Sequence, residues 1–475
     1  MIVSHEWLKQ FVPHTLTAVE VGDLLSRHTV TLDGIEAAGA DLAPFVVAQV
    51  VQAARHPNSE RLWVTKVDDG SGTLLDVVCG APNVLVGTKY PFARTGTLMP
   101  AGITIEKRKI RGETSNGMLC SARELALGDE HDGILALETE APPGTPLLQV
   151  IAAGDSRLNL DVLPNRPDLL SHRGVAREIS AITGIPLHEL PLDDSSGIAG
   201  DVSIPGTTAT EVSIGGVTIR IDDVASCPKY CASVIRGVKV GESPAWLKKR
   251  LESIGIRSIS NVVDCTNYVL HAFGQPVHAF DLGKLAASTI VVRPTREGES
   301  IVTLDGVERK LETGTTVICD GERPVALAGI MGGRNSEVTD ATTDVLIEVA
   351  LFEPGFVRRV RRAVGLSTDA SYRFERGIDP AALQQIAAFT AFMLTDIAGG
   401  EVGGSIHVGD SAASTQPVTL RPARVAHLVG AEISVAEITR CLTALGCYVR
   451  AAIRSNGLNA EIGRASCRER VCCKV

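Results

Sequence analysis

The stretch from Asn261 to Asp281, NVVDCTNYVLHAFGQPVHAFD, constrains the fold of this chain more than any other. Polar side chains of Asp, Asn, Thr and His stand there among Val, Tyr and Phe, and a Gly-Gln-Pro break interrupts the run. Burying each such group without a partner costs roughly 1–3 kcal/mol. The composition is therefore not typical of a plain core strand, and the fold must give these groups partners.

The length and composition predict a globular protein of several domains. A chain of 475 residues is too long for one hydrophobic core and predicts about three domains. Its hydrophobic fraction of 44% and charged fraction of 21% are ordinary for a soluble protein. No apolar run approaches the ~20 residues of a membrane-spanning helix, and the first residues lack the features of a signal peptide. The expected location is the cytoplasm.

Charge and cysteine content argue against an indiscriminate nucleic-acid binder and against a disulfide-stabilised protein. A net charge of −9 argues against indiscriminate binding of nucleic acid, so any RNA contact must come from local basic patches. The eleven cysteines are scattered, which favours reduced thiols over a disulfide framework. Cys227 and Cys231 lack a second pair of ligands at zinc-site spacing, so no metal site is expected in this chain.

Boundary signals predict the first elements. Thr17 and Glu20 form a capping box that predicts a helix over 18–27. From about residue 42 the pattern changes to short alternating runs between turn residues. These runs predict strands at 46–50, 62–67, 74–78 and 134–137. So many short strands in a short stretch of chain favour a small closed barrel.

Three motifs in this region resemble the OB-type tRNA-binding domain of several aminoacyl-tRNA synthetases. They are HPNSER at 56–61, VCGAPN at 78–83 and RGETSNGMLCS at 111–121. The clearest basic cluster of the region lies beside the third motif and consists of Lys107, Arg108, Lys109 and Arg111. The functional interpretation of the cluster is contact with tRNA phosphates. The alternative is a solvated strand end that balances nearby acids.

Further motifs resemble one family over most of the chain. The 261–281 stretch, AGIMGG at 328–333 and TDASYRFERG at 368–377 are similar to the editing module of the bacterial phenylalanyl-tRNA synthetase beta subunits. The resemblance implies an α+β multidomain fold, in which an OB-type β-barrel is inserted in a discontinuous helical N-terminal domain and precedes a mixed α/β editing domain and a small winged-helix-like fragment. The expected boundaries are 1–40 plus 151–190 for the N-terminal domain, 41–150 for the barrel, 191–210 for a linker, 211–400 for the editing domain, 401–417 for a second linker and 418–460 for the winged-helix-like fragment.

Two smaller features have more than one interpretation. Arg166 and Asp168 could form an active-site pair, but the favoured role is structural, with charge-assisted hydrogen bonds holding a turn between two prolines. After residue 418 a helix is expected at 421–428. A second capping box at Ser434 and Glu437 predicts another helix that runs through Leu445 and is closed by Gly446.

The last residues break the pattern of the rest. Residues 461–471 look like a sequencing adaptor translated in one reading frame, so 461–475 are expected to be a non-native tail on a truncated gene product. The less favoured alternative is a natural tail with Cys472 and Cys473 as metal ligands. On the first interpretation, the magnesium-binding carboxylates of the family lie beyond residue 460, together with its catalytic-like and anticodon-contacting domains.

The resemblance also implies a function. The family's enzyme joins phenylalanine to tRNA(Phe) with ATP and magnesium, as an assembly of two alpha and two beta subunits. The alpha subunit carries out aminoacylation, while the beta subunit contributes tRNA binding and hydrolytic editing of Tyr-tRNA(Phe). This chain has no phosphate-loop, dinucleotide-binding or nucleophile-elbow motif of its own. The alternatives are a free-standing tRNA-binding module and an autonomous editing hydrolase.

Carried over residue by residue, the editing pocket of the family falls on Thr266, Asn267, His278, Gly329, Glu348 and Ala370. Thr266, Asn267 and His278 are the candidate editing residues, with the histidine orienting water or the terminal ribose. Glu348, in a predicted buried strand at 346–350, is expected to be ionised and to read the tyrosine hydroxyl; the alternative is a structural carboxylate paired with arginine. Gly329 and Ala370 are expected to form walls, and the alternative for Gly329 is a turn that requires glycine.

Overall fold

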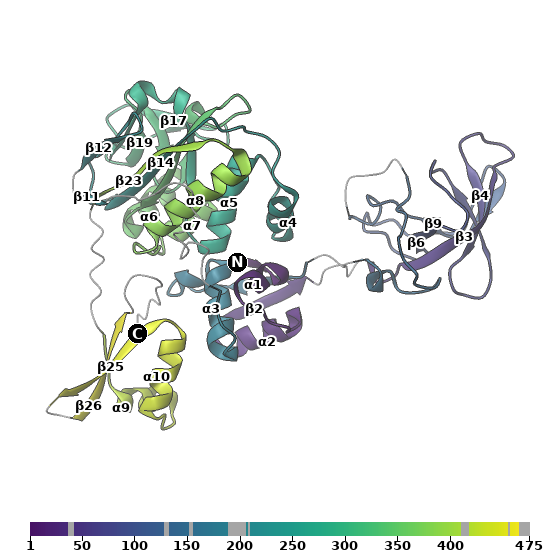
Figure 1. Ribbon diagram of the computed structural model, residues 1–475, viewed down its shortest axis with the longest axis horizontal. Coiled ribbons are helices and arrows are strands. Elements are labelled where there is room, and N and C mark those ends of the chain that lie inside the picture. The colour runs from purple at the N-terminus through teal and green to yellow at the C-terminus, as the bar shows by residue number, and fades with distance from the viewer. Residues whose placement is uncertain are drawn as a thin grey trace. The chain divides into compact units, whose positions relative to one another are not determined.

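The computed structural model describes residues 1–36, 42–127, 133–151, 155–188, 206–207, 210–409, 418–454 and 457–464 (Figure 1). The fold is mixed α+β and divides into two compact units. One unit is continuous in sequence, from Glu36 to Ser156, and the other combines Met1–Ile35 with Arg157–Val475. No helix in the described ranges has the length and apolarity that crossing a membrane would require.

The 36–156 unit is built on an antiparallel sheet that curls into a nearly closed barrel. Its strand order is β5-β4-β3-β6-β9, and a separate hairpin joins β7 and β8. The strands are β3 (Val46–Arg55), β4 (Trp63–Asp68), β5 (Leu75–Cys79), β6 (Lys89–Ala93), β7 (Arg108–Ile110), β8 (Glu113–Ser115) and β9 (Met118–Leu119). The strands predicted at 46–50, 62–67 and 74–78 are confirmed as β3, β4 and β5.

The strand predicted at 134–137 is wrong. Leu137 makes only an isolated bridge to Lys89. The backbone N–H of Leu135 donates to the carbonyl of Cys120, whereas that of Leu137 donates to the carbonyl of Lys89. Because these two donors bond to different segments, to Cys120 just after β9 and to Lys89 in β6, residues 134–137 do not extend one ladder.

The other unit begins with helices packed on a small sheet. The helices are α1 (His5–Phe11), α2 (Ala18–His28) and α3 (His172–Thr183), and the strand order is β1 (Ile2–Ser4), β10 (Arg157–Asp161) and β2 (Thr31–Glu36). The predicted capping box starts α2: Glu20 N–H donates to Thr17 Oγ1 at 3.2 Å, and Thr17 N–H donates to the Glu20 carboxylate at 2.8 Å. Segments from both sides of residues 36–156 therefore share one sheet.

Arg166 and Asp168 hold a turn in this unit, as the structural interpretation predicted. The Arg166 guanidinium donates to both oxygens of Asp168, at 3.0 and 2.8 Å, and also to Glu178. Arg177 donates to Asp168 at 2.8 Å. These ion pairs fix the 3-10 turn η3 (Pro167–Leu169) against α3.

Residues 206–409 form two sheets with helices on them. The first sheet has the order β11-β23-β14-β22-β15, and the second has the order β12-β13-β16-β19-β20-β21. The first contains β11 (Gly206–Thr207), β14 (Lys229–Arg236), β15 (His278–Asp281), β22 (Asp344–Leu351) and β23 (Glu401–Gly409). The second contains β12 (Glu211–Ile214), β13 (Val217–Ile221), β16 (Thr289–Pro294), β19 (Thr316–Cys319), β20 (Pro324–Leu327) and β21 (Met331–Gly332).

The strand β22, which lies between β14 and β15, contributes its two faces to two separate hydrophobic clusters of this region. Val345, Ile347 and Val349 pack in one cluster with residues of α5 and α8. Leu346 and Ala350 pack in the other, with residues of the second sheet, α6 and α7. The helices are α4 (Ala245–Ser253), α5 (Asn261–Phe273), α6 (Pro354–Val364), α7 (Asp369–Phe374) and α8 (Leu383–Ala398), and β17 (Ser300–Val302) with β18 (Glu308–Lys310) forms a hairpin. The buried strand predicted at 346–350 is confirmed.

The linker predicted at 401–417 is wrong in its first half. Residues 401–409 form β23, which pairs with β14, and Ile406 and Val408 are buried. Gly404 allows close packing here, because a Cβ on it would lie 2.6 Å from the Ile214 side chain. Residues 410–417 lie outside the described residues. Of the linker predicted at 191–210, the structure describes residues 206–207 and 210.

The last described elements form a small α+β cluster. They are β24 (Val418–Leu420), α9 (Pro422–Val429), α10 (Val435–Ala444), β25 (Cys447–Arg454) and β26 (Gly457–Arg464). The second capping box forms only in part: Glu437 N–H donates to Ser434 Oγ, but the Glu437 carboxylate pairs with Arg440 at 2.7 Å. Of the tail expected at 461–475, residues 461–464 lie in β26, and the rest, with Cys472 and Cys473, lie outside the described residues.

Candidate functional site

One cavity, of about 250 Å³, is lined by all six residues that the resemblance selected. Thr266 and Asn267 come from α5, His278 from β15, Gly329 from the turn between β20 and β21, Glu348 from β22 and Ala370 from α7. Apolar side chains that include Leu304, Ile318, Leu327 and Phe374 complete the lining. The cavity is therefore an apolar space with a few polar groups, which is the usual construction of a small-molecule site.

The 261–281 stretch folds as a helix, a turn and a strand. Ser260 caps α5 at its start, and Gly274, with φ +77°, ends it in the left-handed conformation that glycine tolerates. The Thr266 hydroxyl donates to the Val263 carbonyl at 2.7 Å, within its own helix. The half-buried Asn267 amide has no hydrogen-bond partner among the described residues, so its donor and acceptor are both available to a ligand.

Glu348 lies on β22, between β14 and the edge strand β15, and faces the cavity. It pairs directly with His278 on β15 and with Ala232 on β14. Only 6% of the residue is exposed. The Tyr230 hydroxyl donates to Glu348 Oε2 at 3.2 Å, and this is the only hydrogen bond of the carboxyl within the described ranges. The arginine-paired alternative is therefore wrong.

The protonation state of Glu348 differs from the expectation. Burial raises the pKa of its carboxyl to about 8, although the Tyr230 hydrogen bond acts in the opposite direction. Desolvation dominates because no cation among the described residues lies against the carboxylate to stabilise its charge. The expectation of an ionised acid is wrong at neutral pH, where Glu348 is a neutral carboxylic acid with one donor and one acceptor group.

His278 is also neutral. Burial lowers the pKa of its imidazole to about 4. Its Nε2 atom is buried and has no hydrogen-bond partner among the described residues. A Cβ on Gly332 would lie 2.7 Å from that nitrogen, so the glycine makes the room that the ring occupies. The other ring nitrogen, Nδ1, has no hydrogen-bond partner among the described residues either and is not closed off in this way, so it can face a ligand or a water molecule.

Gly329 and Ala370 both line the cavity, Gly329 from a turn and Ala370 from a helix. Gly329 has φ +69°, and a Cβ there would lie 3.0 Å from the Phe352 ring, so the turn requires glycine for conformation and for packing. It lines the cavity through its backbone. Ala370 lies in the first turn of α7, behind a capping box in which the Thr368 and Ser371 side chains bond each other's backbone N–H groups.

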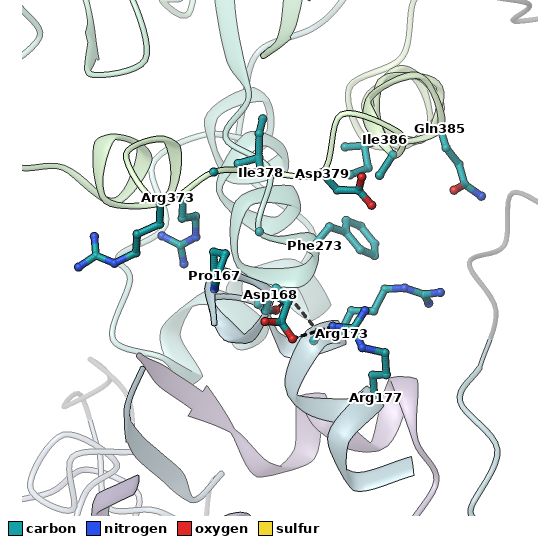
Figure 2. A pocket seen from close by; sticks show the side chains of 16 residues that line it. Pro167, Asp168, Arg173, Arg177, Phe273, Arg373, Ile378, Asp379, Gln385 and Ile386 are labelled. Atoms are coloured by element: carbon teal, nitrogen blue, oxygen red, sulfur yellow. Dashed lines mark hydrogen bonds and ion pairs between the residues drawn. The ribbon is translucent and has the colours of Figure 1, made fainter. Parts of the chain in front are cut away.

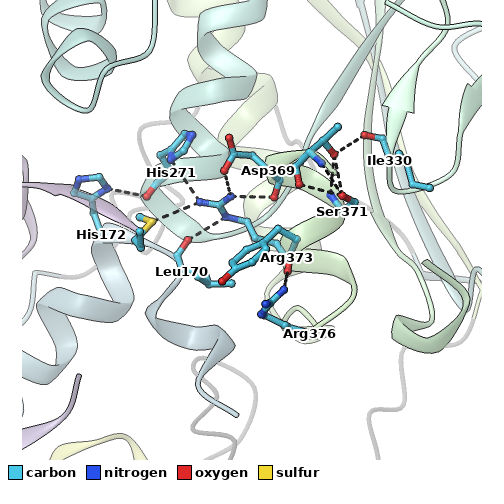
Figure 3. A network of polar contacts seen from close by, with 11 residues as sticks. Leu170, His172, His271, Ile330, Asp369, Ser371, Arg373 and Arg376 are labelled. Carbon is cyan, nitrogen blue, oxygen red and sulfur yellow. Dashed lines mark hydrogen bonds and ion pairs between the residues drawn. The ribbon is translucent and has the colours of Figure 1, made fainter. Parts of the chain in front are cut away.

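A buried arginine anchors α7 to segments distant in sequence (Figure 3). The Arg373 guanidinium donates to the Leu170 carbonyl at 3.1 Å and to Asp369 at 3.0 Å, and lies 3.5 Å from His271 Nδ1. Burial and the charge of Arg373 lower the pKa of His271 to about 3, so the guanidinium faces a neutral ring. The helix that carries Ala370 is thereby held in place at its C-terminal end.

Two family models match this chain. The "Putative tRNA binding domain" model matches residues 45–146, and the "B3/4 domain" model matches residues 226–399, which include every residue of the cavity considered above. A phenylalanine–tRNA ligase beta subunit of Salinibacter ruber is 41% identical over 467 residues, covering 95% of this chain and 55% of that protein. One of Syntrophus aciditrophicus is 43% identical over 453 residues, with the same coverage.

The chain belongs to the phenylalanine–tRNA ligase beta subunit family. It spans about half the length of the curated relatives that it matches. Within this beta-subunit homologue the "B3/4 domain" region holds the cavity, and the "Putative tRNA binding domain" region coincides with the barrel.

The beta-subunit homologue has a second cavity, of about 160 Å³, between α3 and the 373–386 segment (Figure 2). Several arginines line it, but their charges are balanced by acids. Arg177 pairs with Asp168 at 2.8 Å, and Arg376 pairs with Glu375 at 2.6 Å. None of the six predicted residues lies there, and its Arg177–Asp168 ion pair is one of those that fix η3 against α3.

The predicted basic cluster lies on the 36–156 unit of this homologue. Lys107, Arg108, Lys109 and Arg111 are all exposed; Arg108 and Lys109 lie in β7, and Lys107 and Arg111 flank it. Arg108 pairs with Glu106 at 3.3 Å. Arg111, with φ +50°, donates to the Asn58 carbonyl at 3.2 Å, which ties it to the loop of the HPNSER motif. The cations face solvent and can reach an external polyanion.

Two residues of the cavity region were not predicted. Gly332 lies inside the AGIMGG motif, but only the structure shows that it clears the His278 ring. Tyr230 lies in a run, Lys229–Ile235, that is buried throughout. A tyrosine in such a strand needs a partner for its hydroxyl, which is a signal that the sequence did contain.

The part of the chain that the structure describes contains no group of three or more His, Cys, Asp or Glu side chains that could hold a metal ion. Cys227 and Cys231 are buried free thiols. Besides a neutral acid, a neutral imidazole and an amide, the main cavity is lined by Thr266, Thr368 and Asp369, whose carboxylate pairs with Arg373. The neutral acid, imidazole and amide suit recognition of an uncharged polar group.

Proposed function

We propose that the main cavity is the hydrolytic editing site of a phenylalanine–tRNA ligase beta subunit, and that it removes tyrosine from Tyr-tRNA(Phe). The observation that carries the proposal is the pairing of Glu348 with His278 across adjacent strands, in an apolar cavity that also receives the free Asn267 amide. Glu348, Gly329 and Ala370 are assigned to substrate recognition. Asn267, His278 and Thr266 are assigned to the editing chemistry.

Discrimination would rest on the hydroxyl that distinguishes tyrosine from phenylalanine. An apolar pocket built for phenylalanine rejects an added hydroxyl by only about a hundredfold, which leaves errors for a second site to correct. A neutral carboxylic acid both donates to and accepts from a phenol. A phenylalanyl ring would leave this buried group unpaired, at a cost of roughly 1–3 kcal/mol. The same cavity therefore accepts tyrosine and disfavours phenylalanine.

The chemical step is the hydrolysis of an ester. A water molecule attacks the carbonyl carbon of the aminoacyl group, the bond to the terminal ribose oxygen breaks, and free tyrosine and tRNA are released. With its low pKa, His278 is a weak base, so its ring nitrogen orients the water or the ribose instead of taking up a proton at neutral pH. Asn267 holds the aminoacyl ester through its amide.

The remaining assignments follow the family. The 36–156 unit is an OB-type domain that binds tRNA through Lys107, Arg108, Lys109 and Arg111, inserted in a discontinuous N-terminal domain, and residues 418–460 belong to a winged-helix-like fragment. Aminoacylation with ATP and magnesium takes place on an alpha subunit, in an assembly of two alpha and two beta subunits in the cytoplasm. This chain alone is expected to lack aminoacylation activity.

The test uses the purified chain with Tyr-tRNA(Phe) and Phe-tRNA(Phe). The wild-type chain should hydrolyse the tyrosyl ester preferentially, and Glu348→Ala should reduce that preference about tenfold, because the phenol loses its partner. Unchanged relative rates in the variant would remove the role assigned to Glu348. Equal hydrolysis of both esters by the wild type would contradict the editing function itself.

The alternative of an autonomous editing hydrolase predicts a further result. Such a protein would hydrolyse Tyr-tRNA(Phe) at its full rate alone, whereas a synthetase subunit should be stimulated by its alpha partner. The alternative of a free-standing tRNA-binding module predicts binding without hydrolysis. The cavity and its polar groups favour the subunit over that module.

A further inference from the structure

Tyr230 lies on β14, the strand next to the one that carries Glu348. It is fully buried in β14, and it does not line the cavity. Ala232 is the residue of β14 that pairs with Glu348, and Tyr230 precedes it by two positions. Because alternate residues of a strand share a face, Tyr230 and Glu348 lie on the same face as diagonal neighbours. The small Ala232 leaves the space through which the phenol reaches the carboxyl.

The direction of the hydrogen bond between them is fixed by what each group can do. The Tyr230 hydroxyl has no partner among the described residues other than Glu348 Oε2, at 3.2 Å. If the carboxyl donated to the phenol oxygen, the buried phenol hydrogen would have no acceptor, at the cost of an unmade hydrogen bond. Tyr230 therefore donates, and Oε2 is the accepting oxygen of the neutral acid.

We propose that Tyr230 is a positioning residue of the editing site, which holds Glu348 through Oε2 and thereby leaves the Oε1 hydroxyl to read the phenol of a tyrosyl group. The inference rests on the proposed function and deepens it. It makes Glu348 the donor to the oxygen of the substrate, and the phenol hydrogen is then free to meet a second acceptor. His278, on the neighbouring strand and lining the same cavity, offers such an acceptor through its unengaged ring nitrogen Nδ1.

No other polar group among the described residues orients this carboxyl. His278, on the opposite side of Glu348, makes no hydrogen bond to it. Without the phenol of Tyr230, the neutral acid could rotate and present either oxygen to the ligand. The hydroxyl of one buried residue thus decides whether a second residue meets the substrate as donor or acceptor.

The test is Tyr230→Phe in the full chain, which removes one oxygen and keeps the ring. Tyrosyl ester hydrolysis should lose about tenfold in kcat/KM, mainly through KM, while hydrolysis of Phe-tRNA(Phe) changes little. The matched control is Tyr268→Phe, because that buried tyrosine also gives up a hydroxyl, 3.4 Å from Gln10, and should keep the wild-type preference. Equal losses in both variants would indicate a general effect on packing.

A double-mutant cycle separates positioning from a structural role. In a Glu348→Ala background, Tyr230→Phe should have no further effect, since no carboxyl remains to be held. A tenfold loss that persists there would overturn the proposal.

A readout independent of activity is the infrared titration of the Glu348 carboxyl: loss of the Tyr230 donor should move its ionisation to higher pH. An unmoved titration would also overturn the proposal, whereas a wild-type chain without tyrosyl preference would contradict the editing function instead.

Discussion

At the scale of single residues, the cavity depends on a buried acid kept neutral by its surroundings. Glu348 is held by one phenol and has no cation beside it in the described chain, so burial determines its protonation. A charged carboxylate would accept hydrogen bonds from a phenol but could donate none. Neutrality therefore adds a donor to the site, and the same proton makes folding depend on pH.

The sign of that dependence follows from the raised pKa of Glu348. Its carboxyl holds a proton to about pH 8 in the folded chain but releases it near pH 4.5 when the chain is unfolded. The contribution of Glu348 to the free energy of unfolding is therefore complete below pH 4.5 and is lost as the pH rises toward 8. Glu348→Gln mimics the neutral acid and should remove this loss. The difference in melting temperature between variant and wild type should grow from pH 6.5 to pH 8.

Measuring above pH 6.5 separates this effect from that of the histidine. The lowered pKa of His278 gives a contribution of the opposite sign, lost as the pH falls from 6.5 to 4. Both chains contain His278, so the difference between them reports Glu348 alone. A difference that stays constant from pH 6.5 to 8 would show that Glu348 is ionised in the folded chain throughout.

At the scale of elements, the exposed hairpin strand β7 carries the basic cluster. Replacing Lys107, Arg108 and Lys109 with alanine should lower tRNA affinity and flatten its dependence on salt, because each lost phosphate contact removes about 0.7–0.9 from the logarithmic slope. Lys66→Ala is the control in the same unit, since Lys66 already pairs with Asp76 at 2.6 Å. Filter binding over a range of salt concentrations measures both quantities. An identical slope would make the cluster a solvated strand end.

Elements with local signals were predictable from the sequence, and those set by distant packing were not. The capping box of Thr17 and Glu20 and the buried run of β22 depend on neighbours in sequence, and both were found. The glycine-rich 401–409 segment was taken for a linker because its place beside β14, and the contact of Gly404 with Ile214, depend on residues far away. The site residues came from motif resemblance, while the neutrality of Glu348 needed the burial that only the fold provides.

At the scale of the whole molecule, the division into two units allows a test of whether tRNA binding and ester hydrolysis can be separated. The strands that flank residues 36–156, β2 and β10, are neighbours in one sheet. A flexible linker on the order of ten residues can bridge their ends in place of the deleted unit. The shortened chain should fold, keep its preference for the tyrosyl ester and bind tRNA more weakly. Circular dichroism and the hydrolysis assay measure this, and a shortened chain without cooperative unfolding would contradict the division.

The anchoring of Arg373 has a consequence for anyone who designs a minimal fragment. Boundaries drawn at 226–399 from sequence similarity would discard the Leu170 carbonyl, which accepts from this guanidinium in the intact chain. The excised piece would retain a buried cation with an unmade bond at the base of α7. An expression clone for crystallisation or NMR should therefore keep residues 1–36 as well as the chain from Arg157 onward, because β1 and β2 pair with β10 and Leu170 accepts from Arg373.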